Sequence, residues 1–338
     1  MEKVRFGIIG CGVIAAVHIT ALAEIGRAAL YGVFDHSPER REAFAAKYGA
    51  RAYASYAAML ADPAIDAVII CTPSGLHADQ AVQALREGKH VVLEKPMALS
   101  IADCEKLCRE AELSRCVLTV ISQHRFREDV QTVKRLIDEG AFGKLVMCDL
   151  YMKYWRDPSY YASGAWRGTW QMDGGGALMN QGIHGVDLMR YLIGDVKLLR
   201  GRAKTLVHDI EVEDTAAALV EFDCGALGVI EASTAAYPGF SRRIEIHGSR
   251  GYATLVDSTL EKLCIDGEML VDGTVAPDVG TTSDPTQLGA DGHILQLRNF
   301  VAAVRGEEEL VVTARDGCEA VRLIEQIYHS SKQITPQQ

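Results

Sequence analysis

The first 122 residues alternate between short apolar runs and segments with the spacing of amphipathic helices. The apolar runs lack polar alternation, which is typical of strands buried on both faces of a parallel sheet. Their alternation with helices predicts right-handed crossovers and a doubly wound, parallel α/β sheet. The expected strands are residues 4–9, 29–34, 51–54, 66–71, 91–93 and 117–122.

A glycine-rich turn follows the first expected strand directly. Gly10, Gly12 and Ala15 form a Gly-x-Gly-x-x-Ala pattern between strand and helix. The first glycine permits a tight turn, the second lets a pyrophosphate approach the backbone, and the alanine allows the helix to pack closely on the strand. The phosphates would lie on free N–H groups at the helix N-terminus. The pattern therefore predicts a dinucleotide site that includes Val13 and Ile14.

The second expected strand ends in Asp35, 23 residues beyond Gly12, where dinucleotide sites carry an acidic residue. An acidic residue there accepts both hydroxyls of an adenosine ribose and repels a 2′-phosphate, so the sequence favours NAD over NADP. Taken alone, Asp35 would also suit an N-cap for a helix that begins near Pro38. Arg40 and Arg41 lie close by and soften the preference for NAD.

The stretch 90–97, His-Val-Val-Leu-Glu-Lys-Pro-Met, reads as a buried strand that stops at a proline. Lys95 is then left at the carboxyl end of the sheet, where ligands bind in open α/β sheets. An ammonium beside a carboxylate at that edge is a candidate catalytic group. For this motif alone, a solvent-exposed Lys–Glu pair is the alternative.

Thr72, Pro73 and His77 follow the strand at 66–71 and should line the same edge, although His77 would equally suit a helix cap. The complete predicted cofactor site is Gly10, Gly12, Val13, Ile14, Asp35, Thr72, Pro73, His77, Glu94, Lys95 and Gln123.

After residue 122 the strands follow one another through short turns, which predicts a largely antiparallel sheet. The chain is expected to divide into an α/β domain at 1–122 and an α+β domain at 123–338 with a large, open sheet. The free face of that sheet would pair with other copies in a homodimer or homotetramer. The expected strands are 145–154, 198–207, 215–222, 227–233, 242–247, 252–256 and 260–265, with closing helices near 289–305 and 315–331.

A second chemical motif begins with three glycines at 174–176. They open an expected helix, 176–192, whose polar stripe holds Asn180, His184, Asp187 and Tyr191. A neutral imidazole that titrates near physiological pH is the natural proton acceptor for an alcohol. A histidine packed beneath a loop is the alternative for His184 taken alone.

Three of these motifs together resemble the glucose-fructose oxidoreductase, inositol dehydrogenase and MocA (Gfo/Idh/MocA) family over essentially the whole chain. They are the glycine turn at 10–15, Glu94-Lys95-Pro96, and Gly-Gly-Gly-Ala-Leu-Met-Asn-Gln-Gly-Ile-His at 174–184. The resemblance implies an N-terminal Rossmann domain, a C-terminal sheet domain, a bound nicotinamide cofactor, and oxidation or reduction of a sugar or polyol carbon.

The resemblance also implies roles for single residues. The family's catalytic lysine and histidine map onto Lys95 and His184. Its aspartate, four residues before the histidine, maps onto Asn180, which can hydrogen-bond a hydroxyl but cannot hold a proton. A similar asparagine is found in family members that act on sugars and nucleotide-linked sugars.

Aromatic and basic side chains between residues 151 and 170 suit the stacking and clamping of a sugar. In the expected mechanism His184 takes the hydroxyl proton, the carbon gives its hydride to the nicotinamide, and Lys95 stabilises negative charge on the oxygen. The predicted substrate contacts are Lys95, Tyr154, Trp166, Arg167, Asn180, His184, Tyr237 and His293.

The net charge of −10 argues against nucleic acid or an anionic membrane as the main partner. Nine scattered cysteines without a Cys-x-x-Cys pair predict reduced thiols in the cytoplasm and no metal site. The sequence opens directly on a strand and has no apolar run near about 18 residues, so neither a signal peptide nor a membrane span is expected.

Other functions remain open for this pattern. A catalytically silent, dinucleotide-sensing regulator would keep the fold, but Lys95, His184 and the lack of a basic DNA-binding extension favour an enzyme. An enzyme that never releases its NAD is a further alternative. It would swap oxidation states between two sugars, or break a glycosidic bond through a transient ketone.

Overall fold

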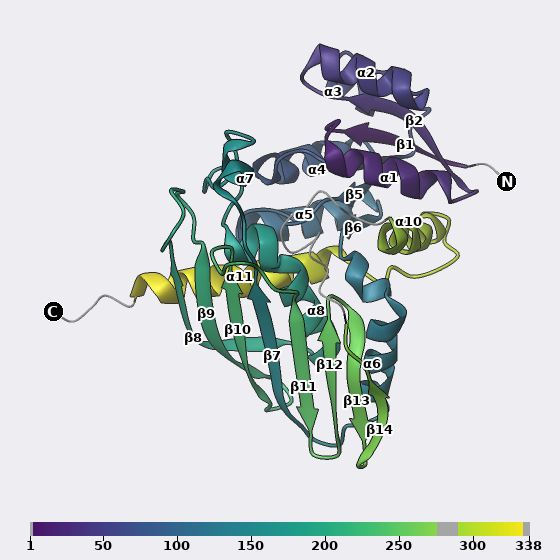
Figure 1. Ribbon diagram of the computed structural model, residues 1–338. Coiled ribbons are helices and arrows are strands. Elements are labelled where there is room, and N and C mark those ends of the chain that lie inside the picture. The colour runs from purple at the N-terminus through teal and green to yellow at the C-terminus, as the bar shows by residue number, and fades with distance from the viewer. Residues whose placement is uncertain (1–2, 276–289, 334–338) are drawn as a thin grey trace. The chain divides into compact units, whose positions relative to one another are not determined.

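A computed structural model describes residues 3–275 and 290–333 (Figure 1). The described residues fall into two compact units. Those of Met1–Gln123 and Leu288–Cys318 form the first, and those of His124–Gln287 and Glu319–Gln338 form the second. The predicted division after residue 122 places Gln123 and the described residues of Leu288–Cys318 in the second domain, whereas both belong to the first unit.

The first unit contains a six-stranded parallel sheet in the order β3-β2-β1-β4-β5-β6. Its strands are apolar on both faces, and all four residues of β4 are fully buried. The strand order reverses beside β1, as in a doubly wound sheet, which confirms the predicted fold. The strands are β1 Val4–Ile9, β2 Ala28–Phe34, β3 Arg51–Ala52, β4 Ala67–Ile70, β5 His90–Leu93 and β6 Leu118–Val120.

Local capping sets the helix boundaries of the first unit. Ser37 accepts a hydrogen bond from the N–H of Arg40 at the start of α2, and Gly49, with a φ of 67°, ends that helix. Ser100 caps α5 in the same way. The helices are α1 Val13–Ala23, α2 Pro38–Tyr48, α3 Tyr56–Leu60, α4 His77–Arg86, α5 Ile101–Ser114 and α10 Asp291–Val304.

Helix α10 belongs to the first unit because its apolar side completes the core there. Leu297, Phe300 and Val301 are buried with residues of β1 and α1. The rings of Phe6 and Phe300 have centroids 6.0 Å apart. An amphipathic pattern predicts that a helix buries one side but does not identify the partner, so the sequence alone assigned this helix to its neighbours in the chain.

The second unit is built on an eight-stranded sheet in the order β14-β13-β12-β11-β7-β10-β9-β8. Only β7 and β10 pair in parallel, which confirms the predicted, mostly antiparallel sheet. The sequence does not predict the edge strand β14, whose residues are mostly exposed. The strands are β7 Leu145–Lys153, β8 Val196–Lys204, β9 Thr215–Phe222, β10 Leu227–Ser233, β11 Arg243–Gly248, β12 Gly251–Val256, β13 Thr259–Ile265 and β14 Glu268–Asp272.

One face of this sheet is exposed along β9 and β10. Alternate residues of β9 and β10 are buried, while Leu219 and Leu227 between them are 43% and 45% exposed. On the buried face, a Cβ added to Gly201 of β8 would meet Ile327, so helix α11 packs closely there. The helices are α6 Glu128–Asp138, α7 Pro158–Ala162, α8 Ile183–Ile193 and α11 Ala314–Gln333, of which α11 also contributes its first residues to the first unit. Within 3–275 and 290–333, no helix combines the length and hydropathy of a membrane span.

The expectation of one regular helix over 176–192 is wrong in its first part. Residues Ala177–Gly182 form a π-helical turn, and α8 follows it. The N–H of Gln181 bonds the carbonyl of Gly176, five residues back, at 3.1 Å. This wider turn changes the direction of Asn180 relative to His184, and such turns are frequent at functional sites.

Candidate active site

The glycine turn of the first unit has the shape of a phosphate cradle. Gly10 has a φ of +89°, and a Cβ there would lie 2.7 Å from the carbonyl oxygen of Cys71, so the position requires glycine. A Cβ at Gly12 would meet no atom within 4 Å, which leaves open space above the backbone. No side chain caps the start of α1. Its first N–H groups therefore suit the pyrophosphate of a dinucleotide, and Val13, 58% exposed, borders that space.

Asp35 follows β2 and supports the same turn. Its carboxylate accepts hydrogen bonds from the N–H groups of Cys11 and Ser37, both at 2.9 Å. The helix cap considered as its alternative role belongs to Ser37 instead. A guanidinium nitrogen of Arg40 lies 3.7 Å from the Asp35 carboxylate. A basic group therefore lies beside the carboxylate that would repel a 2′-phosphate. Ribose binding by Asp35 stays a prediction.

The loop after β4 is tied to the loop after β5 by His77. Its Nδ1 lies 2.7 Å from the carbonyl oxygen of Pro96, and its Nε2 lies 2.9 Å from that of Thr72. Burial lowers the pKa of this imidazole against the opposing effect of the two carbonyls. The ring is 1% exposed. His77 thus holds the sheet edge together, while its predicted contact with the cofactor is not tested.

Gln123, just after the last strand, offers a vacant hydrogen-bond acceptor. The residue is 8% exposed, and its Oε1 has no hydrogen-bond partner among the described residues. Buried polar atoms without a partner are rare in proteins, and a donor on a bound ligand would complete this one. The uncapped helix, the open space at Gly12 and this amide acceptor together fit a dinucleotide with an amide-bearing ring.

Lys95 is half-buried beyond the end of β5, as expected. Its N–H donates to Oε2 of Glu94 at 3.2 Å. The other oxygen of Glu94 lies 2.8 Å from Nε2 of His18. Both carboxylate oxygens of Glu94 therefore have protein partners, while its predicted contact with the cofactor stays a prediction.

In the second unit, the three glycines make a turn that no other residue could form. Gly174 and Gly175 have φ of +73° and +154°, and a Cβ at Gly175 would lie 2.1 Å from the Tyr328 hydroxyl. Glu213 closes this turn by accepting the N–H groups of Gly176 at 3.0 Å and Leu178 at 2.8 Å.

Glu213 also accepts the hydroxyl proton of Tyr328, at 2.9 Å. Burial raises the pKa of Glu213 despite these donors. Sequence patterns give no signal for Glu213, because it acts across the fold on residues far from it in the chain.

Asn180 does not stand alone. Its amide donates to the carboxylate of Asp173, and its carbonyl accepts from Gln181 at 2.9 Å. Asp173 is 2% exposed and also accepts the N–H of Gly168 at 2.7 Å. The site therefore includes a carboxylate that the sequence comparison with the family did not reveal.

His184 is half-buried and packs edge-on against His124, with ring centroids 5.2 Å apart. Nδ1 of His124 lies 3.0 Å from the Ser258 hydroxyl, which accepts from Arg242 at 2.7 Å. The ring of His184 thus packs against a hydrogen-bonded network of His124, Ser258 and Arg242 in the second unit.

The other members of the predicted stripe have a structural role. Asp187 is buried and accepts two hydrogen bonds from Arg125, at 2.9 and 2.5 Å. The Arg125 guanidinium also lies 4.9 Å from the ring centre of Tyr191. A stripe read from helical spacing therefore overstates the polar surface available to a substrate.

An aromatic and basic cluster joins Asn180 through Gln181. The Tyr160 hydroxyl accepts from Arg167 at 2.5 Å and from Gln181 at 2.8 Å. Arg156, 3% exposed, donates to Gln181 at 3.0 and 2.8 Å. Arg167 also lies 4.5 Å from the Trp166 ring centre, so the two predicted contacts Trp166 and Arg167 belong to this cluster.

The remaining predicted substrate contacts have different surroundings. The ring centre of Tyr154 lies 5.5 Å from the guanidinium of Arg156, a member of the same cluster. Tyr154 is buried, and burial raises its pKa. Tyr237 is 77% exposed, with its ring edge-on to Trp155. His293 is 1% exposed and lies in the first unit beside His18.

Comparison with known proteins agrees with both units. Residues 4–122 match the model of an oxidoreductase family with an NAD-binding Rossmann fold, and 130–254 match the GFO/IDH/MocA C-terminal domain. The Bordetella pertussis WlbA dehydrogenase, solved with NADH and UDP-GlcNAcA, superposes with a TM-score of 0.88 at 34% identity, covering 99% of this chain and 98% of that one.

Curated relatives give the same family. Myo-inositol 2-dehydrogenase of Thermotoga maritima is 27% identical over 94% of this chain and 93% of its own length. Inositol 2-dehydrogenase of Rhizobium meliloti is 28% identical over 95% and 94%. The predicted enzyme class and NAD cofactor are confirmed. The chain belongs to the Gfo/Idh/MocA family of NAD-binding oxidoreductases.

Proposed function

We propose that the protein is an NAD-dependent dehydrogenase that oxidises a secondary hydroxyl of a sugar, polyol or sugar derivative. The main support for this proposal is the position of Lys95. It is half-buried at the carboxyl edge of the nucleotide-binding sheet, and its backbone N–H donates a hydrogen bond to Glu94. His184, whose ring packs against the hydrogen-bonded His124, supplies the proton acceptor.

Each side chain has a defined part in this reaction. Bound NAD⁺ supplies the hydride acceptor. The Nε or Nδ lone pair of His184 takes the proton of the hydroxyl, and Lys95 donates a hydrogen bond to the same oxygen as negative charge develops on it. The carbinol carbon loses hydride, so the products are a ketone, NADH and protonated His184. Asn180 orients the hydroxyl through its amide and carbonyl groups.

A substrate panel with NADH absorbance tests the proposal. We expect NADH to accumulate with at least one hexose, inositol or nucleotide sugar. NAD that co-purifies tightly and never accumulates as free NADH would favour the alternative in which the cofactor stays bound through both half-reactions. NAD binding without turnover of any substrate would favour the non-catalytic regulator.

A nucleotide-linked sugar acid is a specific candidate substrate. The WlbA dehydrogenase, solved with UDP-GlcNAcA, is 34% identical to this chain. Two guanidinium groups, Arg156 and Arg167, lie 5.8 and 4.2 Å from the ring centre of Tyr160, in the cluster that reaches Asn180 through Gln181. Cations of this geometry suit carboxylate or phosphate groups.

Comparing UDP-GlcNAcA with UDP-GlcNAc as substrates measures the contribution of the sugar carboxylate. We expect kcat/KM to be about tenfold or more higher for the acid, because a charge-assisted hydrogen bond contributes about 1.5–3 kcal/mol. A higher value for myo-inositol than for both would remove this candidate and leave the dehydrogenase proposal intact.

We further propose that copies of the chain associate through the open sheet face that bears Leu219 and Leu227. Light scattering would report a dimer or tetramer at micromolar concentration, and a monomer there would contradict it.

All nine cysteines are free thiols, which suits a reducing compartment such as the cytoplasm.

A further inference from the structure

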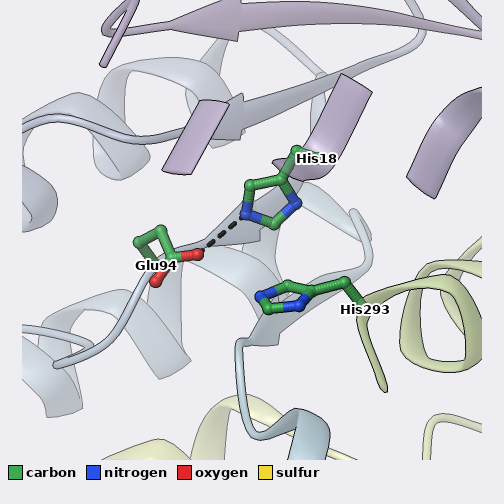
Figure 2. Close-up of side chains that lie close together, drawn as sticks. All are labelled: His18, Glu94 and His293. Atoms are coloured by element: carbon green, nitrogen blue, oxygen red, sulfur yellow. Dashed lines mark hydrogen bonds and ion pairs between the residues drawn. The ribbon is translucent and has the colours of Figure 1, made fainter. Parts of the chain in front are cut away.

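A buried cluster in the first unit joins three separate elements. His18 comes from α1, Glu94 from the loop after β5, and His293 from α10 (Figure 2). Their exposed fractions are 0%, 6% and 1%. The rings of His18 and His293 meet edge to face, with centroids 5.2 Å apart. The mechanism proposed above gives none of the three a direct chemical step.

Glu94 links this cluster to Lys95. One carboxylate oxygen lies 2.8 Å from Nε2 of His18, and the other accepts the N–H of Lys95 at 3.2 Å. A carboxylate held at both oxygens has a fixed orientation. Through the second bond, it fixes the backbone from which the Lys95 side chain extends.

The cluster also preserves the charge of Glu94. Burial alone would raise the pKa of this carboxyl, but the hydrogen bond from His18 and the charges of His18, His293 and Lys95 lower it to about 2. Glu94 is therefore a buried anion at neutral pH. An anion beside an ammonium favours the charged form of the lysine.

We propose that His18 is a positioning residue for Lys95, acting through Glu94, and that His293 holds the His18 ring in place. This inference rests on the proposed function, in which Lys95 contacts the reacting oxygen. It gives His293 an indirect role in place of the substrate contact that the sequence suggested.

A metal ion is the competing explanation for the same three residues. Their ligand atoms lie within 4.8 Å of one another, and two histidines with one glutamate are a donor set that binds Zn²⁺. The hydrogen bond between His18 and Glu94 needs a proton where a metal would be. One equivalent of zinc in protein purified without chelator would therefore overturn the proposal.

The decisive experiment compares His18→Leu with His18→Gln. Leucine removes the donor to Glu94, whereas the glutamine amide can replace it. Without a donor, burial leads Glu94 to take up a proton, so Lys95 loses its anionic neighbour and its amine becomes more reactive. Labelling with N-hydroxysuccinimidyl acetate, followed by mass spectrometry of each lysine, measures that reactivity without a substrate.

Lys89 is the matched control, since it precedes the same strand and donates to the carbonyls of Asp62 and Ile65 at 2.9 and 2.8 Å. We expect His18→Leu to label Lys95 about threefold faster or more, with Lys89 unchanged, and His18→Gln to label as the parent protein does. Equal labelling of Lys95 in all three proteins would overturn the proposal. So would faster labelling of both lysines, because that pattern reports general loosening.

Turnover gives the second readout. His18→Leu should lower kcat by about tenfold or more, with little change in the dissociation constant of NAD, and His18→Gln should restore most of it. If Lys95→Ala keeps full turnover, the catalytic role proposed for Lys95 is wrong. The labelling result still decides whether His18 positions Lys95. If Lys95→Ala is inactive and His18→Leu is fully active, only the positioning role fails.

Discussion

The side-chain amide of Asn180 donates a hydrogen bond to the carboxylate of Asp173. Asn180 stands where the family resemblance places an aspartate, so the carboxylate that is missing at 180 is present at 173, seven residues away in the chain. Asp173 is almost fully buried and also accepts the N–H of Gly168. The Asn180 amide and the Asp173 carboxylate therefore form a hydrogen-bonded pair, and changing one of them leaves the other without its partner.

A reciprocal exchange tests that unit. Asn180→Asp alone places two carboxylates side by side, and their repulsion should lower kcat by about tenfold or more. Adding Asp173→Asn restores one amide and one carboxylate in contact, so the double variant should recover most of that loss. Steady-state kinetics on the best panel substrate measures both. Independent, additive losses in the two single variants would contradict coupling between these residues.

Lys95→Ala and His184→Ala should each lower kcat by about 10²-fold or more, because general acid-base and electrostatic contributions have that size. Binding of NAD, followed by titration calorimetry, should change little in either variant. Lys106→Ala, at a partly exposed lysine of α5, is the control. Near-normal turnover in one of the two variants would withdraw the role assigned to that residue.

Asp35→Asn should weaken the preference for NAD over NADP by about tenfold, because it removes the charge that repels a 2′-phosphate. The asparagine keeps one oxygen to accept the N–H of Cys11 or Ser37, so the glycine turn should keep its shape. The nearby Arg40 would then contact the phosphate. The ratio of kcat/KM for the two cofactors is the measurement. An unchanged ratio would show that Asp35 only supports the turn.

The bond from Tyr328 to Glu213 should matter less than the bonds from the backbone to Glu213. Tyr328→Phe removes one donor and should lower the free energy of unfolding by about 1 kcal/mol. Glu213→Ala leaves the buried N–H groups of Gly176 and Leu178 without an acceptor and should cost about 3 kcal/mol or more. Urea unfolding separates the two. Similar losses in both variants would contradict the view that Glu213 mainly holds the glycine turn.

Asp214 should make stability depend on acidity. It is buried and accepts the N–H groups of Leu206, Val207 and His208 at 2.9, 2.7 and 2.9 Å. Burial opposes ionisation, but these donors outweigh it and hold the pKa of Asp214 below its ordinary value. The unfolded chain therefore takes up this proton first as the pH falls. The stabilisation is complete above the unfolded pKa of about 4 and is lost as pH drops toward the folded value.

Asp214→Asn should accordingly be less stable than the parent protein at neutral pH by about 1–3 kcal/mol. The gap should narrow below about pH 4, where the parent loses its advantage. Urea unfolding of both proteins over this range gives the comparison. A gap of constant size at every pH would mean that the ionised form of Asp214 brings no special stability.

Motifs that act through local backbone geometry were predictable from sequence. Gly10 is required by the turn between β1 and α1, Gly12 leaves open space beside it, and Lys95 is placed by the proline that ends its strand. These inferences needed only neighbours in the chain. The same holds for the two sheets, because unbroken apolar runs predict buried parallel strands and successive strands joined by short turns predict an antiparallel sheet.

Residues that act across the fold were not predictable in this way. Glu213 and His18 reach their partners through tertiary contacts that no spacing records. Asp173 bonds residues only five and seven positions away, but it lies in an irregular stretch of turns without a regular repeat. The π-helical turn breaks the regular spacing on which the polar stripe was based, and Asp187 turned out to pair with Arg125. Helical periodicity shows which side chains share a face, but it does not show which polar ones already have partners.

Helix α10 completes the core of the nucleotide-binding unit, although it is encoded near the end of the chain. Phe300, which packs on Phe6, and His293, which meets His18, are encoded after the whole of the second sheet. During synthesis the strands of the parallel sheet therefore leave the ribosome first. The apolar surface that α10 covers stays exposed until residues 291–304 have been made. A truncated protein that stops before this helix would expose that flank, so separate expression of the N-terminal half should yield aggregates rather than a working nucleotide module.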